Sequence, residues 1–473
     1  MNTHSQVAVV GAGMSGLAAA FWLGRAGVDV RIFEREATAG GTMRTIRDGP
    51  WLVETGPNSA LETTPLFAEL FAALDLQEQH LYADPASDRR YILRGGTLHA
   101  LPMSPPAFLK TPLWSLPAKL RLLKEPFIGR ARVEESVAAF VRRRLGQEFL
   151  DYAINPFVAG VYAGDPEELS VRAAFPKLYR LEDRYGGLIR GMLLGARERK
   201  RRAETAKDRA RMFSFRDGMQ VFPAALQGVL GERLELSTPV ESITLSEEEK
   251  AGVPAEFRLS CRHQGGLVHH TAQAVVISTP ARAASALLAG MAPDASGVLG
   301  RIVYPPVAEV FLGYRAEQCP RPLDGFGFLV PAREGRNILG TIWSSALFPG
   351  RAPAGHIALT SFVGGSRQPA LLELSDAELL RLVRDDLQSI MGIQGEPVVH
   401  RIARWERAIP QYTMGYQEIL DGLERCEREV PGLFFCANFR GGIAVGDCLM
   451  SAKNVSGRVR EYVHTHSVST IQR

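Results

Sequence analysis

Cysteine is scarce in this chain, with 5 residues among 473, and the 10 histidines are scattered. No cysteine forms a CxxC pair or has a histidine at the spacing of a zinc site, which argues against a structural zinc and against a disulfide framework. The thiols are therefore expected to be reduced, as in the cytoplasm. HExxH, GxSxG and Walker A motifs are also missing. We predict no metal site and find no acid/base constellation that would carry catalysis.

Long hydrophobic runs are missing as well: no stretch of 18 or more apolar residues occurs, so no membrane-spanning helix is expected. The first residues show no signal-peptide or transit-peptide pattern. The formal net charge is only +4, which does not favour nucleic acid but permits an anionic ligand or an anionic membrane surface. With 46% hydrophobic and 22% charged residues, the chain can bury a sizeable core.

A glycine-rich turn lies close to the beginning of the chain. Residues 6–10 predict a strand and residues 17–25 a helix, and residues 11–16 between them read Gly-Ala-Gly-Met-Ser-Gly. The first glycine allows the tight turn, the second the approach of a pyrophosphate, and the third close helix packing. A second predicted strand, residues 28–33, ends at Glu34, where a carboxylate can accept hydrogen bonds from ribose hydroxyls. The pattern predicts a βαβ unit that binds a dinucleotide.

Further segments favour a long, extended cofactor. They are the Gly-Gly-Thr-Met-Arg sequence at 40–44, Glu-Thr-Gly-Pro at 54–57, Gly-Met-Gln at 218–220, Pro-Val at 239–240 and the glycine-rich stretch 441–447. In this order they resemble the GG-doublet FAD flavoproteins, the superfamily of the amine oxidases and protoporphyrinogen oxidases. The resemblance implies FAD, bound non-covalently. The residues it implies for FAD binding are Gly11, Ala12, Gly13, Met14, Ser15, Gly16, Glu34, Arg35, Gly41, Thr42, Arg44, Gly56, Pro57, Asn58, Ser59, Val240, Trp405, Gly442, Ile443 and Ala444.

Within that superfamily the chain resembles the oxygen-dependent protoporphyrinogen oxidases over nearly its whole length. The most specific matches are residues 155–166 (NPFVAGVYAGDP) and 362–367 (FVGGSR). The resemblance implies a six-electron oxidation of protoporphyrinogen IX to protoporphyrin IX in haem biosynthesis, in three FAD-mediated steps that consume oxygen and release H₂O₂. Coproporphyrinogen III is a second substrate to consider. An amine or polyene oxidoreductase, or a non-catalytic FAD-stabilised tetrapyrrole carrier, are further alternatives.

The resemblance also implies residues that face a tetrapyrrole. Arg90 would pair with a propionate, because a guanidinium meets a carboxylate in a bidentate fork. Leu329 and Ile342 would sandwich one pyrrole ring, and Phe362 would stack on another. Gly160 would lie against the macrocycle, where a Cβ would crowd it. No catalytic side chain is assigned, since the flavin would do the chemistry; Asn58 is the candidate next to the flavin.

The expected fold is α/β, with a Rossmann-like FAD-binding domain of the amine oxidase type, a mixed-sheet (α+β) substrate domain and a helical membrane-binding lobe. Each of the first two domains is built from separate segments of the chain. The FAD-binding domain is assigned to residues 1–80, 213–298 and 404–473, the substrate-binding domain to 81–93 and 299–403, and the helical lobe to 94–212.

The helical lobe carries an apolar cluster that is expected to be exposed, formed by Leu113, Trp114 and Leu116, with lysines and arginines around it. Apolar anchors flanked by basic residues suit a segment that lies on an anionic membrane surface. The family resemblance favours a monotopic anchor, so we expect a cytoplasmic bacterial protein attached to the inner face of the cell membrane. A basic run at 197–202 could add to this attraction. The resemblance further implies a possible homodimer.

Overall fold

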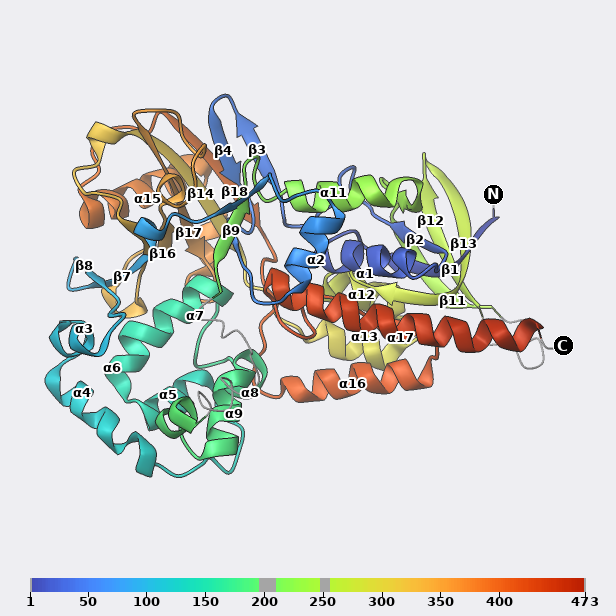
Figure 1. Ribbon diagram of the computed structural model, residues 1–473, viewed down its shortest axis with the longest axis horizontal. Coiled ribbons are helices and arrows are strands. Elements are labelled where there is room, and N and C mark those ends of the chain that lie inside the picture. Colours follow the sequence, from blue (N-terminus) through green and yellow to red (C-terminus); the bar gives the residue numbers. More distant parts are fainter. Residues whose placement is uncertain (1, 195–209, 247–255, 472–473) are drawn as a thin grey trace.

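The computed structural model describes residues 2–194, 210–246 and 256–471, so the basic run at 197–202 lies outside the described residues. Two seven-stranded sheets lie at opposite ends of the molecule, and a group of helices lies below the second sheet (Figure 1). Among the described residues, no helix combines the length and the apolar character needed to cross a membrane.

The first sheet is mostly parallel and is covered by helices on both faces, as buried parallel sheets are. On β1, Val7 and Val9 join the core under α1, α11 and α17, whereas Ala8 and Val10 join the core under α12, α13 and α16. Both faces are thus apolar. The sheet runs in the order β10 (Leu234–Glu235), β2 (Val30–Phe33), β1 (Asn2–Val10), β13 (Gly266–Ile277), β12 (Phe257–His263), β11 (Val240–Leu245), with β19 (Leu433–Phe435) also paired to β13.

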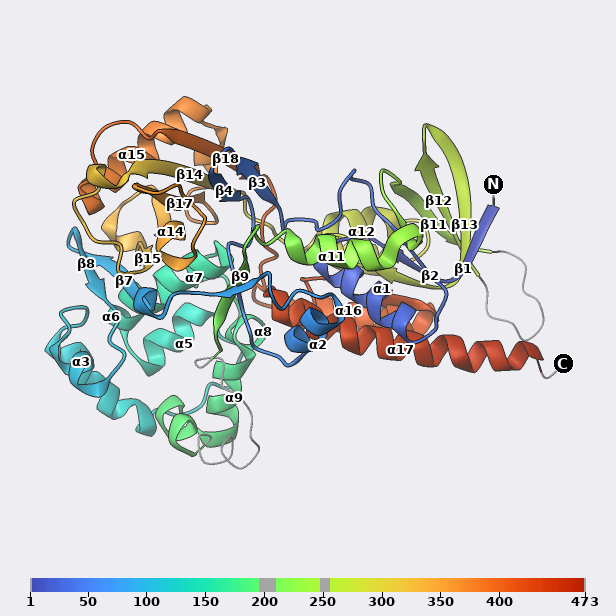
Figure 2. The same ribbon diagram turned by 45° about the horizontal axis from the view of Figure 1, so that its top comes forward.

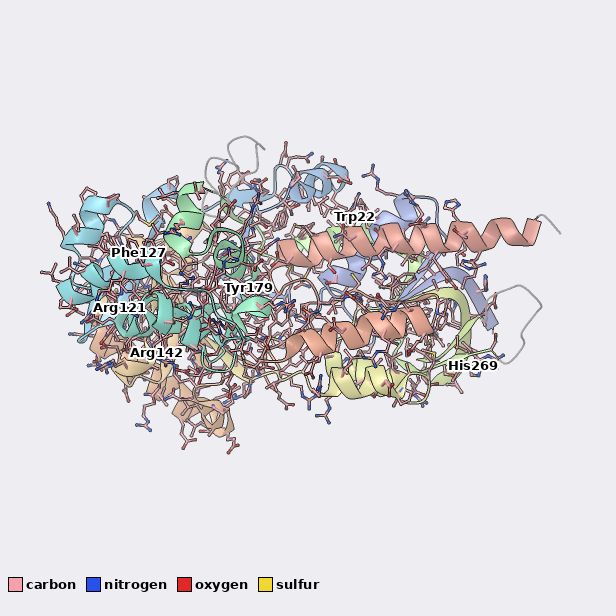
Figure 3. The ribbon with its side chains drawn as sticks, turned by 90° about the horizontal axis from the view of Figure 1, so that it is seen from below. Trp22, Arg121, Phe127, Arg142, Tyr179 and His269 are labelled. Atoms are coloured by element: carbon pink, nitrogen blue, oxygen red, sulfur yellow. The ribbon has the colours of Figure 1, made fainter. Side chains whose placement is uncertain are left out.

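The helices on this sheet come from distant parts of the chain. Helix α17 lies along α1, and both run beside the sheet (Figure 3). The covering helices are α1 (Met14–Arg25), α2 (Leu66–Ala73), α11 (Val221–Leu230), α12 (Ala281–Leu288), α13 (Pro293–Gly300), α16 (Tyr416–Glu429) and α17 (Val445–Ile471). The beginning, the middle and the end of the chain therefore build one layered unit.

The second sheet is mixed. Helix α15 (Asp376–Met391) packs on one of its faces through Leu379, Val383 and Leu387. The other face is turned toward α7 and the helical lobe (Figure 2). The strand order is β18 (Val399–Trp405), β14 (Val307–Arg315), β17 (His356–Gly364), β16 (Ile338–Ile342), β15 (Gly325–Leu329), β7 (Arg89–Arg94), β8 (Thr97–Ala100).

The helical lobe begins later than the boundary at residue 94 suggests. That boundary falls inside the β7–β8 hairpin, and the first helix starts at Pro105. Serine side chains accept a hydrogen bond from the backbone N–H three residues ahead and so cap α3, α4, α5 and α8. The lobe contains α3 (Pro105–Lys110), α4 (Leu116–Arg121), η2 (Leu122–Phe127), α5 (Val137–Arg144), α6 (Gln147–Phe149), η3 (Leu150–Ile154), α7 (Asn155–Tyr162), α8 (Val171–Ala174) and α9 (Pro176–Tyr185).

The expected exposure of Leu113 and Trp114 is wrong. Leu113 is fully buried and Trp114 is 5% exposed, and the Trp114 ring stacks on Phe149 with a centroid distance of 4.7 Å. These two residues form part of the lobe's core because the chain turns inward between α3 and α4. Leu116 is exposed as expected, at 66%, and Phe127 is exposed at 83%.

Smaller elements connect these parts. They are the hairpin β3 (Thr45–Asp48) and β4 (Trp51–Glu54), the three strands β5 (Ala60–Leu61), β9 (Met212–Phe215) and β6 (His80–Tyr82), helix α14 (Ser344–Leu347), and the short turns η1 (Pro85–Ser87), η5 (Gly231–Arg233), η6 (Ala316–Gln318), η7 (Ala332–Glu334) and η8 (Pro369–Glu373).

Candidate active site

The turn between β1 and α1 leaves room for a ligand at the helix N-terminus. Gly11 has φ +102° and donates its N–H to the Phe33 carbonyl at 2.8 Å. A Cβ on Gly16 would lie 2.0 Å from the Gly11 carbonyl oxygen, so only glycine allows this packing. A Cβ on Gly13 would meet no protein atom within 4 Å, and no side chain caps the helix there. This open cradle of N–H donors fits a pyrophosphate. Met14 and Ser15 follow Gly13 in the first turn of α1.

Glu34 lies at the end of β2 and is held in place by the backbone. Its Oε2 accepts the Ala12 N–H at 2.7 Å, and its Oε1 accepts the Glu36 N–H at 3.0 Å. The carboxylate therefore stands at the carboxyl edge of the sheet beside the glycine turn, the position that suits a ribose. Two other predicted FAD-binding residues lie elsewhere. Arg35 points outward and pairs with Glu36. Val240 is the first residue of β11, two strands beyond β13 in the first sheet.

The Gly-Gly turn lies directly against the first glycine turn. Gly40 donates its N–H to the Ala12 carbonyl at 2.8 Å, and a Cβ on Gly41 would lie 3.3 Å from the Gly13 Cα. Arg44 donates from Nε to the Gly41 carbonyl at 2.8 Å. The two glycine turns, separate in the sequence, thus form one surface.

Trp405 joins this surface from the second sheet. Its Nε1 donates to the Thr55 carbonyl at 2.6 Å, and the Arg44 guanidinium lies 5.8 Å from the centre of its ring. Gly56 is tightly placed, since a Cβ there would lie 1.8 Å from the Thr42 carbonyl oxygen. The structure therefore brings the 40–44 turn, the 54–59 segment and Trp405 together. Pro57 and Ser59 flank Asn58 in this segment and are partly exposed.

The glycine-rich C-terminal stretch precedes the longest helix. Gly441 and Gly442 have φ of +95° and +126°, and the Gly442 N–H donates to the Tyr412 hydroxyl at 3.0 Å. Ile443 and Ala444 then lead into α17. This helix lies along α1 (Figure 3). The glycine turn before α1 and the glycine-rich stretch before α17 therefore belong to the same layered unit.

Three residues predicted to face a tetrapyrrole share one face of the second sheet. Leu329 on β15 pairs with Gly340 on β16, and Gly340 pairs with Phe362 on β17. Ile342 lies two residues along β16 from Gly340, on the same face. Leu329, Ile342 and Phe362 are all partly exposed, although most residues of β15, β16 and β17 are buried. An apolar face with accessible side chains results.

Helix α7 covers this face closely. A Cβ on Gly160 would lie 2.4 Å from Leu329 Cδ2, so a side chain there would push into the apolar face. Arg90 on β7 pairs with Gly327 on β15, which gives it the same face as Leu329 two residues further on. Arg90 is exposed at the rim, and its guanidinium lies 6.0 Å from the Phe326 ring. The five predicted substrate residues are thus gathered around one face.

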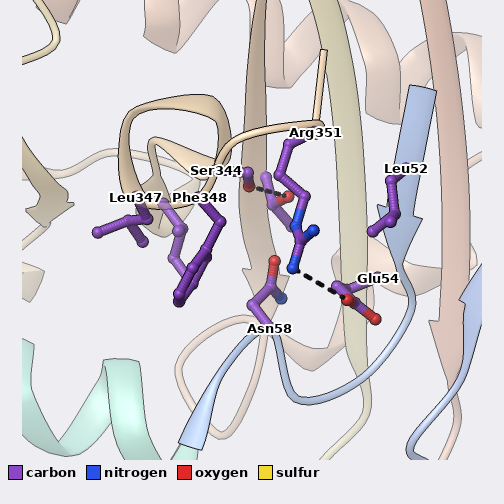
Figure 4. Close-up of a pocket in the computed structure, with 9 residues that line it drawn as sticks. Leu52, Glu54, Asn58, Ser344, Leu347, Phe348 and Arg351 are labelled. Carbon is purple, nitrogen blue, oxygen red and sulfur yellow. Dashed lines mark hydrogen bonds and ion pairs between the residues drawn. The ribbon is translucent and has the colours of Figure 1, made fainter. Parts of the chain in front are cut away.

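The sequence interpretation missed a buried charged cluster behind Asn58. Glu54, Arg351 and Asn58 line one small pocket with Ile342 and Ser344, and Figure 4 shows Glu54 and Arg351 side by side. A guanidinium nitrogen of Arg351 lies 4.0 Å from Glu54 Oε1, and the same guanidinium donates to the Ser214 hydroxyl at 2.7 Å. The cluster connects the β3–β4 hairpin and β9 to the second seven-stranded sheet.

Burial controls the protonation of this cluster. It raises the pKa of Glu54 to about 7, although hydrogen bonds from Thr45 and Met219 and the charge of Arg351 oppose the rise. A second buried carboxyl, that of Glu309 on β14, lies near Glu54. Burial and the nearby Glu54 raise the pKa of Glu309 well above the ordinary value. A lone glutamate inside the apolar sequence 307–312 was the signal that could have revealed it.

Comparisons with known proteins agree with this geometry. The family model described as "flavin containing amine oxidoreductase" matches residues 14–460 of this chain. The mitochondrial protoporphyrinogen oxidase of Nicotiana tabacum is 35% identical, with 99% of this chain and 97% of that protein covered. The coproporphyrinogen III oxidase of Bacillus subtilis is 27% identical, with 94% and 96% covered.

Solved structures share the architecture. A structure from Exiguobacterium sp. 255-15, provisionally assigned as a protoporphyrinogen oxidase, superposes with a TM-score of 0.78 at 25% identity and covers 97% of this chain and 98% of that one. Putrescine oxidase superposes with a TM-score of 0.72 at 17% identity, with 98% and 100% covered, which supports the fold alone. The open cradle at Gly13 and the two apposed glycine turns fit FAD. The chain belongs to the flavin-containing amine oxidoreductase family, uses FAD as its cofactor, and groups there with the protoporphyrinogen oxidases.

Proposed function

We propose that this protein oxidises a porphyrinogen to a porphyrin, with protoporphyrinogen IX as the leading substrate and molecular oxygen as the final electron acceptor. The observation that carries the proposal is the partly exposed apolar face of Leu329, Ile342 and Phe362, with Arg90 at its rim. The pyrrole rings of a porphyrinogen are flat and apolar, and protoporphyrinogen IX carries its carboxylates on one side, which matches that face and its basic rim. Relatives named protoporphyrinogen oxidase support the same substrate class.

The chain's own residues bind and orient the substrate in this proposal. FAD, when bound along the glycine turns, supplies the two-electron oxidation chemistry. The apolar face holds the macrocycle, and α7 limits its position through the close approach at Gly160. A fixed macrocycle places the reacting methylene bridge reproducibly, and such positioning supplies much of the rate in reactions without a catalytic side chain.

The first test is porphyrin fluorescence during aerobic incubation with protoporphyrinogen IX and, in parallel, with coproporphyrinogen III. We expect protoporphyrin to form well above the rate of autoxidation, with loss of this activity in protein freed of FAD. The relative from Bacillus subtilis makes coproporphyrinogen III the second candidate. Faster formation of coproporphyrin would move the substrate to that molecule; no acceleration of either would overturn the proposal.

We expect Arg90→Ala to raise the KM for the porphyrinogen by about tenfold to a hundredfold, since a hydrogen bond to a charged group contributes about 1.5–3 kcal/mol. The turnover number should change less, because the propionate is bound in both ground and transition states. Steady-state fluorescence kinetics measure both constants. Arg89→Ala is the matched control: Arg89 is the neighbouring residue, and its guanidinium pairs with Asp324 at 2.6 Å. An equal effect of the two substitutions would contradict the assignment of Arg90.

We further propose that the helical lobe rests on a membrane surface at the inner face of the cell membrane. Large apolar side chains are exposed along α3, α4 and η2; they are Leu109 (70%), Leu116 (66%), Leu120 (54%), Leu123 (70%) and Phe127 (83%). Phe127 lies near the end of the lobe, away from the first sheet (Figure 3). Lys110 and Lys124 occupy the same segments and would attract anionic lipid.

The double substitution Leu116→Ser with Phe127→Ser is expected to weaken binding to anionic vesicles at least about tenfold, since burying one such side chain contributes about 1.5–3 kcal/mol. Co-sedimentation with vesicles of phosphatidylglycerol and phosphatidylcholine measures the effect. Val229→Ser, which removes an exposed apolar side chain from α11 at the first sheet, should leave binding unchanged. Equal binding of all variants would contradict the membrane proposal. The homodimer remains a prediction. Measuring the molar mass of the protein in solution tests it.

A further inference from the structure

Glu309 is a charged side chain in the middle of a buried strand. All residues of β14 from Val307 to Tyr314 are buried, and Glu309 is 7% exposed. It lies on the strand face that also carries Val307 and Phe311, whereas Ala308 and Val310 point into the core beneath α15. A carboxyl at such a position is costly unless something binds it.

The Glu309 carboxyl is not fully satisfied by the protein. Among the described residues, its Oε2 is buried without a hydrogen-bond partner. The Asn58 amide lies near the carboxyl and lowers its pKa, opposing the effect of burial, while Asn58 Nδ2 donates to the Gly56 carbonyl at 3.1 Å. The nearby guanidinium of Arg351 is engaged with Glu54, Ser214 and the Phe215 carbonyl. One oxygen of Glu309 is thus left without a partner among the described residues.

That oxygen belongs to the same face as the predicted substrate residues. Glu309 pairs directly with Phe362, which pairs with Gly340, which in turn pairs with Leu329. The row therefore places Glu309 one strand beyond Phe362 and beside Asn58, the residue expected next to the flavin. No other carboxyl occurs in this row of the sheet.

The chemistry of the substrate matches a single buried acceptor. A porphyrinogen offers four pyrrole N–H donors at its centre and no acceptor nitrogen there, while its ring faces are apolar. We propose that Glu309 accepts a hydrogen bond from a pyrrole N–H and takes that proton as the ring is oxidised. This inference rests on the proposed function and assigns a catalytic residue to a site that otherwise works by positioning.

The step balances in atoms and charge. In the first two-electron oxidation, bound FAD would accept a hydrogen with its electron pair from a methylene bridge. Over all three oxidations the macrocycle loses four bridge hydrogens and two pyrrole N–H hydrogens, so one of the three protons comes from a bridge carbon. The cation left on the substrate has an acidic pyrrole N–H, so the N–H bond breaks toward the Glu309 carboxylate and an O–H bond forms. When dioxygen is then reduced to H₂O₂, the proton on Glu309 completes the second O–H bond of the peroxide.

The groups around Glu309 define the expected pH dependence. Glu54 on β4 lies near it, and Glu54 in turn pairs with Arg351 from the loop after α14. Arg401 lies on the same face of β18 in a pair with Asp48, and α7 carries no charged residue. Burial first and Glu54 second raise the pKa of Glu309. Because the carboxylate is the acceptor, the rate of flavin reduction should rise with pH and level off once Glu309 is ionised.

The test compares the holoenzyme with Glu309→Gln, which keeps the shape and removes the proton acceptor. Flavin reduction by the porphyrinogen is followed anaerobically by stopped-flow absorbance between pH 6 and pH 9, a range chosen about neutrality. We expect the Gln variant to be slower by about a hundredfold, a typical contribution of a general base, and to lose the rise with pH. Glu309→Asp should recover part of the rate and keep the pH dependence.

An independent readout does not depend on turnover. Infrared spectra of the resting holoenzyme should contain protonated-carboxyl bands that disappear as the pH is raised. The component from Glu309 should be missing in Glu309→Gln, while the component from Glu54, whose pKa is about 7, should remain. Asp386→Asn is the matched control, because Asp386 is equally buried but lies beneath the opposite face of the sheet, where it accepts the N–H groups of Asn337 and Ile338. It should change neither the spectrum's pH-dependent bands nor the rate of flavin reduction.

The outcomes separate the two proposals. Wild-type rates and an unchanged pH profile in a flavin-loaded Glu309→Gln variant would overturn the role of Glu309 while leaving porphyrinogen oxidation intact. A wild-type flavin that no porphyrinogen reduces would overturn the proposed function. If the Gln variant bound no flavin, Glu309→Asp would decide: a wild-type rate without pH dependence would overturn the inference, and a slowed, pH-dependent rate would support it.

Discussion

Replacing Arg144 by methionine is expected to destabilise the helical lobe by about 3–5 kcal/mol, the cost of leaving a buried carboxylate without its partner. Arg144 on α5 is fully buried, and so is the Glu125 carboxylate that its Nη1 contacts at 2.8 Å. Its Nε also donates to Glu182 on α9 at 3.0 Å. One guanidinium therefore joins three segments of the lobe.

Glu125 determines the size of this effect. Its carboxylate accepts the N–H groups of Leu188 and Ile189 at 2.7 and 3.0 Å, so it cannot turn toward water when Arg144 is removed. Glu182 would keep Arg143 as a partner. The uncompensated charge is therefore that of Glu125, and the segments η2 and α5 should separate first.

Hydrogen–deuterium exchange of peptides from α5 and α9 measures the opening free energy of the lobe. Arg142→Met is the matched control, since Arg142 lies on the same helix but pairs with Glu167 at the surface, where both side chains are about half exposed. Such exposed pairs contribute less than about 1 kcal/mol. Similar small effects in both variants would contradict the importance assigned to burial.

Replacing Gly13 by valine is expected to weaken FAD binding at least about a hundredfold, or about 2.8 kcal/mol at 1.4 kcal/mol per factor of ten. The reason is the open cradle: the side chain would enter space where no protein atom lies within 4 Å. Gly13 has φ −71° and ψ 177°, an extended conformation that valine adopts readily. The protein without flavin should therefore remain folded.

Absorbance of the bound flavin and its dissociation constant measure this effect, and circular dichroism reports the fold. Gly228→Ala is the control, because no atom lies within 4 Å of its added Cβ either, yet it belongs to α11, away from the glycine turns. It should keep FAD and gain up to about 1 kcal/mol of stability. Full flavin content in Gly13→Val would contradict the position assigned to the pyrophosphate.

The cofactor-binding region could be predicted from sequence because its signals are local. Gly11 and Gly16 are required by one tight turn, and Glu34 closes the strand that follows, so residue type and spacing over a short stretch specify the geometry. The exposure of Leu113 and Trp114 could not be predicted in the same way. Their burial depends on Phe149, which lies on another helix, and an apolar pair beside lysines has the same pattern whether it faces lipid or a core.

The sequence by itself determined the dinucleotide turn and the family resemblance, because both follow from short motifs whose residues are neighbours in the chain. Only the tertiary structure decided that Glu309 meets Asn58 and Glu54, that Arg144 joins Glu125 to Glu182, and that Leu329 and Phe362 share a row. Strand register and helix packing set these encounters. A glutamate in an apolar strand becomes informative once the groups around its carboxyl are known. Burial and neighbouring groups then determine both its protonation and the groups that it can contact.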